Sequence, residues 1–298
     1  MTLDPRVSLP GTPPAARGRM PGAARRARRV DASLLVGAAL VGLVVVTALV
    51  SFVWTPHPPD LTDGSVALRG PMPGYPLGTD RLGQDELSRL MVGARTTLLV
   101  GIVSVGVAAL VGVPLGIVAG MRGGLLGRLL MRANDVLLAF PALLLAIMLA
   151  AVRGGSTTVA MVAIGIASIP SFARVTRAGV LSIMHREYIL AARAAGRSSL
   201  GIAVHHVLPG VANLVIVQAS VAFGMAILAE AGLSYLGVGT PPDVPSWGRM
   251  LYDSQATLWQ TPRLAWVPGL AIAVAVLGFN LLGDGLRDLL DPTLEDRG

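Results

Sequence analysis

The sequence predicts an all-α polytopic membrane protein with six transmembrane helices. Of the 298 residues, 53% are hydrophobic and only 14% are charged, and long apolar stretches recur along the chain. Because an ordinary soluble domain carries about 25% charged residues, so few charges do not cover a water-soluble globule of this size. Within lipid only helices and closed barrels satisfy the backbone, so we expect the apolar stretches to be helices.

Six apolar stretches approach the roughly 20 residues that a helix needs to cross a bilayer. The predicted spans are residues 32–54, 96–121, 133–152, 156–173, 211–239 and 264–282. A secretory signal peptide is the competing interpretation of the first stretch. That stretch exceeds the roughly 7–15 apolar residues of a signal-peptide core, so we expect it to be retained as a signal anchor. The fourth span is short and contains Pro170, and a tight turn at 153–155 joins it to the third.

The arginine distribution predicts the orientation of these spans. All 24 basic residues are arginine, and an even number of spans places both termini on one side. Seventeen arginines belong to that side, and seven to the other: Arg69, Arg81, Arg89, Arg95, Arg153, Arg249 and Arg263. Since positive charge stays inside, we expect both termini in the cytoplasm. Topology therefore explains the net charge of +7, and we do not expect nucleic acid as a partner.

The predicted organisation follows from the spans. Residues 1–30 are rich in Pro, Gly, Ala and Arg without apolar periodicity, and we expect a disordered basic cytoplasmic tail. The remaining segments are a first transmembrane helix (31–54), an extracytoplasmic loop with an interfacial helix (55–95), the main transmembrane domain (96–290) and a cytoplasmic tail (291–298). A cytoplasmic loop at 174–210 lies within the main domain.

Residue types that are missing exclude several kinds of chemistry. Without cysteine there is no disulfide framework and no thiolate nucleophile, and without lysine there is no phosphate-loop lysine of an ATPase. His205 and His206 are adjacent, so on a helix they diverge by about 100° and do not share one metal ion. Gly-Asp-Gly at 283–285 is too short for a phosphate loop, and we expect it to end the sixth span. We find no catalytic triad and no paired catalytic carboxylates, so we expect no cofactor and no metal in this chain.

The cytoplasmic loop at 174–210 is too polar to be embedded and too patterned to be a plain linker. Residues 187–195 are good helix formers, with arginines on one face and an opposite face made of Tyr188, Ala191, Ala192 and Ala195. We expect Gly196 to end this helix, and Leu208-Pro209 to end a second short helix at 198–207. An amphipathic hairpin resting on the membrane is the alternative, but alanine buries too little area to hold such a helix there.

Five ordered blocks of sequence resemble the membrane subunits of ABC importers, in the dipeptide, oligopeptide and nickel branch of those permeases. Ala191, Ala192, Gly196, Leu208 and Pro209 match the "EAA" loop of that family with its Gly to Leu-Pro spacing. The other blocks are LGTD at 77–80, ILAEAGLSYLG at 227–237, PSWG at 245–248 and NLLGDGLRD at 280–288. The resemblance covers about residues 30–295. The loop departs from the family at Leu190, where the name of the loop expects Glu, although Glu187 lies nearby.

The resemblance implies a type I ABC importer transmembrane domain in a bacterial inner membrane, forming half of a translocation path. It implies a coupling loop that includes Glu187, Ala191, Ala192, Gly196, Leu208 and Pro209. The implied partners are a second permease subunit in a heterodimer, two ATPase subunits that carry ATP and Mg²⁺, and an extracytoplasmic substrate-binding protein. A short peptide is the expected substrate, with nickel or another small solute as the alternative. A membrane-embedded enzyme and a channel that works without ATP are the hypotheses from other classes.

Single polar residues leave further interpretations open. Glu230 is the only carboxylate well inside an apolar run, and its position favours either a hydrogen bond to loop backbone or a gate or path role. The charged residues before the second span form either a solvated interfacial helix or a contact for a partner: Asp80, Asp85, Glu86, Arg89 and Arg95.

Overall fold

The computed structural model describes residues 21–290, with side chains from residue 32 onward, and over that range it contains helices and no strand. The α-helices are α1 (Pro21–Val53), α2 (Glu86–Arg122), α3 (Gly124–Ala139), α4 (Ala142–Arg153), α5 (Thr157–Ile183), α6 (Glu187–Ala194), α7 (Ser199–Ile202), α8 (Leu208–Tyr235), α9 (Trp247–Ser254) and α10 (Arg263–Leu290). Five helical runs in this range are long and apolar enough to cross a membrane, and the bent pair α3–α4 makes a sixth. The predicted fold class is confirmed.

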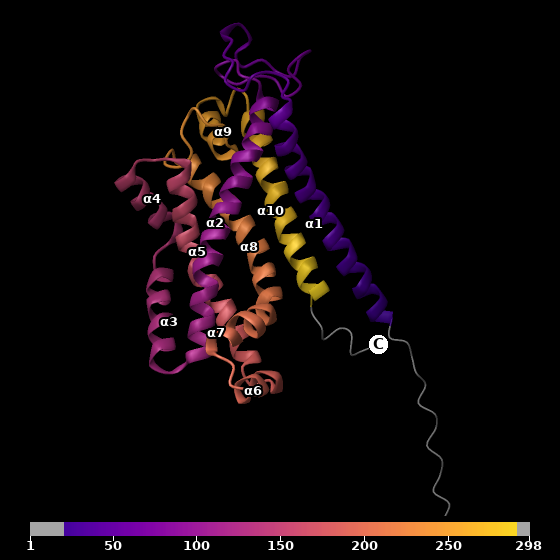
Figure 1. Cartoon of the computed structure of the whole chain (residues 1–298). Helices are drawn as coiled ribbons and strands as arrows, with labels where there is room; N and C mark the ends of the chain where they lie inside the picture. Colours follow the sequence, from indigo (N-terminus) through magenta and orange to yellow (C-terminus); the bar gives the residue numbers. More distant parts are fainter. Residues whose placement is uncertain (1–20, 291–298) are drawn as a thin grey trace, which may run out of the picture.

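The long helices run roughly alongside one another (Figure 1). At one end lie α9 and the irregular segment 54–85, and at the other end lie α6 and α7. The pairs α2–α5, α1–α10 and α8–α10 make the most extensive contacts between helices. We call residues 54–85 and 236–262, together with the first turn of α2 (86–89) and Arg263 at the start of α10, the outer cap, and the loop between α5 and α8 the cytoplasmic loop. Both names follow the orientation predicted from the arginines.

Helix α1 begins earlier than the predicted first span. We expected residues 1–30 to be disordered, but the helix already starts at Pro21. Pro is favoured at the first helical position, and the Ala and Arg that follow are good helix formers. Residues 1–20 and the predicted tail at 291–298 lie outside the described residues.

Helix α2 is one continuous helix of 37 residues, so the predicted separate interfacial helix is wrong. Asp85 caps its N-terminus, since its Oδ2 accepts a hydrogen bond of 3.1 Å from the backbone N–H of Ser88. The turns before Thr96 extend the span outward into the cap.

The predicted third span is broken into α3 and α4, which meet at an angle of 80°. Phe140 precedes Pro141 and has extended backbone, with φ −81° and ψ 126°. A residue before proline is driven out of the helical region by the proline ring, and proline has no N–H to continue the ladder. The helix therefore stops at Ala139 and restarts at Ala142 in a new direction.

Helix α5 continues ten residues beyond the predicted end of the fourth span, so the loop is shorter than we expected. Pro170 lies inside this helix, and its carbonyl oxygen accepts a hydrogen bond of 3.3 Å from Asn134 Nδ2 on α3. Neighbouring helices commonly satisfy backbone groups around proline in this way. Close packing against α2 also favours the long helix, because a Cβ at Gly116 would lie 2.6 Å from the Ala173 carbonyl oxygen.

Two further boundaries differ from the predictions. Leu208-Pro209 does not end a helix but opens α8, directly after a π-helical turn at Ala203–Val207. The missing N–H of a proline costs nothing in the first turn of a helix, and the wider π turn relieves crowding by its ring. Gly-Asp-Gly at 283–285 lies inside α10, where a Cβ at Gly285 would lie 2.7 Å from Leu34 Cα on α1. The glycines here allow close packing and do not end the helix.

Candidate functional site

The cytoplasmic loop is built on a sharp helix stop followed at once by a helix start. Gly196 has φ +76°, its N–H donates to the Arg193 carbonyl at 2.9 Å, and the Arg197 N–H donates to the Ala192 carbonyl at 3.1 Å. This pair of bonds is the Schellman ending of a helix, which favours glycine because it needs a positive φ. Ser198 then caps α7 by accepting from the Gly201 N–H at 3.1 Å. The predicted bend at Gly196 is thus present.

Within this chain, glycine is needed at this bend for its backbone conformation. A Cβ at position 196 would meet no described atom within 4 Å. The requirement visible in this chain is the backbone conformation, and the surface around Gly196 is open.

Three buried aliphatic side chains fasten the loop to the spans. Ile189 of α6, Ile202 of α7 and Val207 of the π turn pack in one cluster with Val180 of α5 and Val211 of α8. Ile189 and Val207 are fully buried. The loop therefore has its own small core, which packs it against α5 and α8.

These anchors were missed by sequence reasoning, which followed the alanine face. Ile189 and Ala192 are three residues apart and both turn toward the spans, so the i, i+3 spacing of these two residues was the available signal. Of the predicted coupling residues, Ala192 is half-buried against this cluster. Glu187, Ala191, Gly196, Leu208 and Pro209 are exposed.

The outward surface of the loop is more apolar than its alanines alone suggest. Large hydrophobic side chains are exposed on it at Tyr188, Leu190, Leu200, Val204 and Leu208. Tyr188 lies near the other end of the loop, with its ring centre 6.2 Å from that of His206. The structure therefore brings the start of α6 close to the chain entering α8, while the tip at Gly196 stands apart. Exposed apolar area of this kind marks contact surfaces for other molecules.

Glu230 is fully buried near the C-terminal end of α8, where it holds the following loop. Its Oε1 accepts hydrogen bonds from Ser234 Oγ at 2.7 Å and from Thr240 Oγ1 at 2.9 Å. Ser234 Oγ also accepts from the Thr240 N–H at 2.9 Å. This geometry supports the interpretation in which Glu230 fastens the chain after α8, as opposed to a carboxylate facing an open path.

The comparison with protein families decides which class of protein has this fold and loop. The model of the binding-protein-dependent transport system inner membrane component matches residues 112–296, which is more than half of the chain. The chain belongs to this family of transport permeases. The predicted resemblance to ABC importer permeases is thereby confirmed, as is a multi-pass location in a membrane.

Curated relatives of this permease match most of its length. It is 40% identical over 264 residues to the dipeptide transport system permease protein DppC of Alkalihalophilus pseudofirmus, covering 86% of each chain. It is 42% identical to the di/tripeptide transport system permease protein DppC of Pseudomonas aeruginosa, over 77% of this chain and 76% of that one. It is 44% identical to the glutathione transport system permease protein GsiD of Pectobacterium atrosepticum, over 76% and 75%.

A solved structure shares the fold of the permease. The MetNI methionine ABC transporter in an inward-facing conformation contains a chain that matches with a TM-score of 0.56 and 19% sequence identity. The match covers 68% of this chain and 96% of that chain. The fold is that of a type I ABC importer transmembrane domain.

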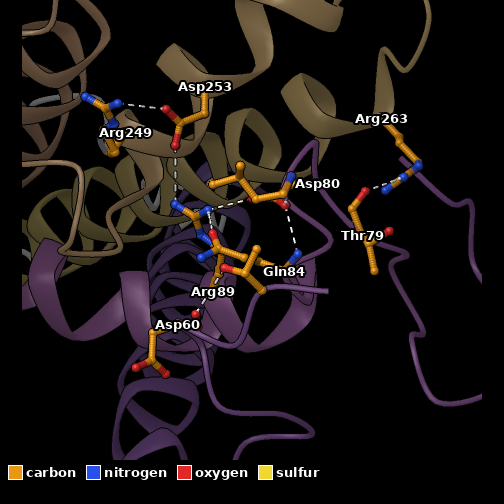
Figure 2. Close-up of polar contacts among 10 residues, drawn as sticks. Asp60, Thr79, Asp80, Gln84, Arg89, Arg249, Asp253 and Arg263 are labelled. Carbon is orange, nitrogen blue, oxygen red and sulfur yellow. Dashed lines mark hydrogen bonds and ion pairs between the residues drawn. The ribbon is translucent and has the colours of Figure 1, made fainter. Parts of the chain in front are cut away.

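Two of the charged residues before the second span, Asp80 and Arg89, join an internal network in the outer cap of the permease (Figure 2). Arg89 donates to Asp80 Oδ2 at 2.7 Å and to Asp253 Oδ2 at 3.3 Å, and Arg249 contacts Asp253 Oδ1 at 2.9 Å. Asp80 also accepts from the backbone N–H groups of Leu82 and Gln84, at 2.8 and 2.9 Å. The network joins the first turn of α2 to α9.

The interpretation of a solvated helix is therefore wrong for four of the five charged residues before the second span, since Asp80, Asp85, Glu86 and Arg89 are all buried.

Hydrogen bonds from side chains to backbone carbonyl groups also hold the cap together. Arg263 at the start of α10 donates to the carbonyl oxygens of Leu77 and Thr79 at 2.7 and 2.8 Å. The Trp247 indole N–H donates to the Leu90 carbonyl at 2.9 Å. Through these contacts the cap joins α2, α9 and α10.

No group of three or more His, Cys, Asp or Glu is placed to hold a metal ion among the residues that the structure describes. Within the same range, Asp80, Arg89, Arg249 and Asp253 of the cap are paired with one another, and the polar side chains around Glu230 fasten a loop. The family that the chain belongs to is one of transport permeases.

Proposed function

We propose that this permease imports short peptides with energy from ATP, as one of two membrane subunits of an ABC importer. Support comes from relatives named as dipeptide, di/tripeptide and glutathione permeases, at 40–44% identity over at least three quarters of the chain. The observation that carries the coupling part is the bent cytoplasmic loop, which is anchored to two spans and exposes an unpartnered surface.

The energy source lies on other chains in this proposal. With no lysine anywhere, the chain has no phosphate-loop lysine, so two separate ATPase subunits bind ATP and Mg²⁺. A second, homologous permease completes a heterodimer, and an extracytoplasmic binding protein delivers the substrate. The arginine distribution supports an orientation with both termini and the loop in the cytoplasm.

The loop works as a lever in this account. Glu187, Ala191, Leu208 and Pro209 lie on its exposed surface and contact a groove of the ATPase, while Gly196 shapes the bend. Ala192 packs inward with the anchors, so a push on α6 moves α5 and α8 as a unit. Alternating access in transporters is commonly such a rigid-body motion around a central path. A gate or path role for Glu230 is a separate proposal, which its hydrogen bonds to the following loop do not favour.

The alternatives lack a specific supporting observation. Nickel import would draw support from a cluster of metal ligands, and the described residues contain none. A membrane enzyme would need polar groups gathered at one membrane depth, and a channel would have no use for an anchored loop with an exposed apolar surface.

The direct test of the proposal is reconstitution. The chain is purified with the proteins that co-purify with it, the binding protein is identified, and ATP-dependent uptake of a labelled dipeptide is measured in proteoliposomes. We expect uptake that requires ATP and the binding protein. Competition of glutathione and of Ni²⁺ with the labelled dipeptide then compares the substrate classes. Absence of any co-purifying ATPase, or uptake that proceeds equally without ATP, would overturn the proposal.

A further inference from the structure

A hollow of about 460 Å³ lies between the cytoplasmic end of α2 and the bend of the loop. Three arginines line it, Arg122 from the end of α2 and Arg193 and Arg197 from the two sides of Gly196. Ile117, Val118 and Met121 of α2 form an apolar wall on the membrane side. The hollow therefore combines a cationic rim with an apolar wall that continues into the span.

The charge in this hollow is not neutralised by the described part of the chain. No carboxylate is among its lining residues, and none of the three arginines forms an ion pair with a described Asp or Glu. In the outer cap, by contrast, Arg89 and Arg249 are both paired with carboxylates. A group of guanidiniums left in this way is complementary to an anion from outside the chain.

Contacts within the fold position these three arginines. The backbone of Arg193 and Arg197 is fixed by the Schellman bonds around Gly196. The Nη1 of Arg197 lies 3.0 Å from Nε2 of His206, and because a guanidinium has no acceptor, the arginine donates this bond. Arg122 closes the helix at the C-terminus of α2, where the span leaves the apolar region.

We propose that this hollow binds the phosphate group of an acidic phospholipid from the inner leaflet. The cytoplasmic leaflet carries acidic lipids, and basic pockets on that side of transmembrane helices attract their headgroups. The apolar wall at Ile117 and Val118 offers a surface for the acyl chains, which a free phosphate ion would leave unused. This assignment rests on the cytoplasmic orientation proposed above.

The consequence concerns how the loop is held. Its buried anchors pack against α5 and α8 and, more loosely, against Ile117 and Met121 of α2, while the hollow opens between the loop and the end of α2. A bound lipid therefore adds a charged bridge between the loop and α2, and loop movement depends on the lipid composition of the membrane.

The test is lipid binding to the full chain in mild detergent, measured by native mass spectrometry with added phosphatidylglycerol or phosphatidylcholine. We expect the chain to retain phosphatidylglycerol in preference to phosphatidylcholine. Replacement of two arginines, Arg122→Gln with Arg193→Gln, should weaken phosphatidylglycerol binding about 25-fold, at about fivefold for each arginine near a membrane surface. The matched control is Arg128→Gln with Arg186→Gln, which removes two exposed arginines outside the hollow and should leave binding unchanged.

Each outcome decides for or against the lipid. Equal binding of the two lipids, or equal loss in the variant and its control, would overturn the proposal. Displacement of the lipid by excess inorganic phosphate, or by the ATPase subunit in the assembled transporter, would also overturn it. If the Gln variant does not fold, Arg122→Lys with Arg193→Lys keeps the charge and should retain the preference for phosphatidylglycerol. These readouts do not involve transport, so failure of the peptide proposal is distinguished from failure of this one.

Discussion

In the outer cap, Arg89 is buried and paired with Asp80 and Asp253, whereas in the loop at the other end of the spans Arg193 is exposed and pairs with no described carboxylate. The apolar side chains follow the same division. Trp247 of the cap is buried against α2, while Leu190 and Leu200 of the loop project outward. Both regions lie at the ends of the same spans.

The charged and apolar side chains of the cap contact other parts of this chain, whereas those of the loop are exposed and available to other molecules. In the cap, Arg89, Arg249 and Arg263 are all paired within the chain, and their contacts join α2, α9 and α10. The loop keeps its core small and leaves charged and apolar groups for other molecules. Substitutions in the cap should therefore act on the stability of the permease, and those on the surface of the loop should act on assembly and transport.

The largest expected effect comes from Arg89→Ala in the cap. Removing one partner of a buried ion pair leaves uncompensated charge on Asp80, while Asp253 keeps its pair with Arg249, and such a loss typically costs about 3–5 kcal/mol. We expect a large fall in the thermal unfolding midpoint in detergent, and the loss of folded protein from membranes. Arg186→Ala on the exposed loop is the control and should change the midpoint little. Equal midpoints for the two variants would contradict an internal role for the cap network.

The next effect tests the anchor of the loop, with Ile189→Ala compared with its neighbour Leu190→Ala. Ile189 is fully buried in the loop cluster, and truncation of a buried Ile costs about 2–5 kcal/mol. Leu190 is 51% exposed, so its truncation should leave the fold unchanged. Hydrogen exchange of residues 187–207 should rise in Ile189→Ala, with loss of uptake. Unaltered exchange in that variant would show that the loop is not held by this cluster.

Substitutions of Glu230 distinguish a role in holding the loop after α8 from a role in a gate or path. Glu230→Ala removes the acceptor of Ser234 and Thr240, and leaving buried hydroxyls unpaired costs about 1–3 kcal/mol. Glu230→Gln keeps an acceptor oxygen at the same place, so we expect folded protein and near-normal uptake. Measurements of the unfolding midpoint and of uptake would separate the two roles. A Gln variant that folds normally but no longer transports would favour the gate or path role.

The smallest expected effect on the isolated chain comes from the bend. Gly196→Val places a β-branched residue at φ +76°, which costs about 1–2 kcal/mol, while Gly196→Asn should cost less because Asn tolerates this region. Gly106→Ala is the matched control, since a Cβ there also meets no atom within 4 Å and its φ is not positive. We expect uptake to be highest in the Gly106→Ala control, lower in Gly196→Asn and lowest in Gly196→Val. Normal uptake by Gly196→Val would contradict a role for the bend in coupling.

The sequence predicted up to six spans and the helix ending at Gly196, because apolar length and a helix-ending glycine are local signals. It did not predict the break at Pro141, since the apolar run 133–152 continues across that residue without interruption. Helix ends at Ile183 and Leu290 were missed for a related reason, because these helices continue past the apolar stretches of the sequence.

The cap network was beyond sequence reasoning for a physical reason. Arg89 and Asp253 are 164 residues apart, and nothing local distinguishes a paired arginine from a solvated one. Ile189 was likewise hidden in a helix assessed by its alanine face, although its burial depends on Val180 and Val211 of two other helices. Tertiary contacts of this kind decide the role of a residue, and composition does not reveal them.

Crosslinking of the loop to an ATPase subunit is the most direct test of the coupling account. Since the chain has no cysteine, Ala191→Cys gives a single thiol on the exposed surface of α6, and Leu82→Cys gives a matched exposed thiol in the outer cap. In the assembled transporter we expect Ala191→Cys to crosslink to the nucleotide-hydrolysing subunit with a yield that changes with ATP, and Leu82→Cys to give no such product. Labelling of Ala191→Cys from the extracytoplasmic side, or no crosslink to that subunit in any nucleotide state, would contradict the account.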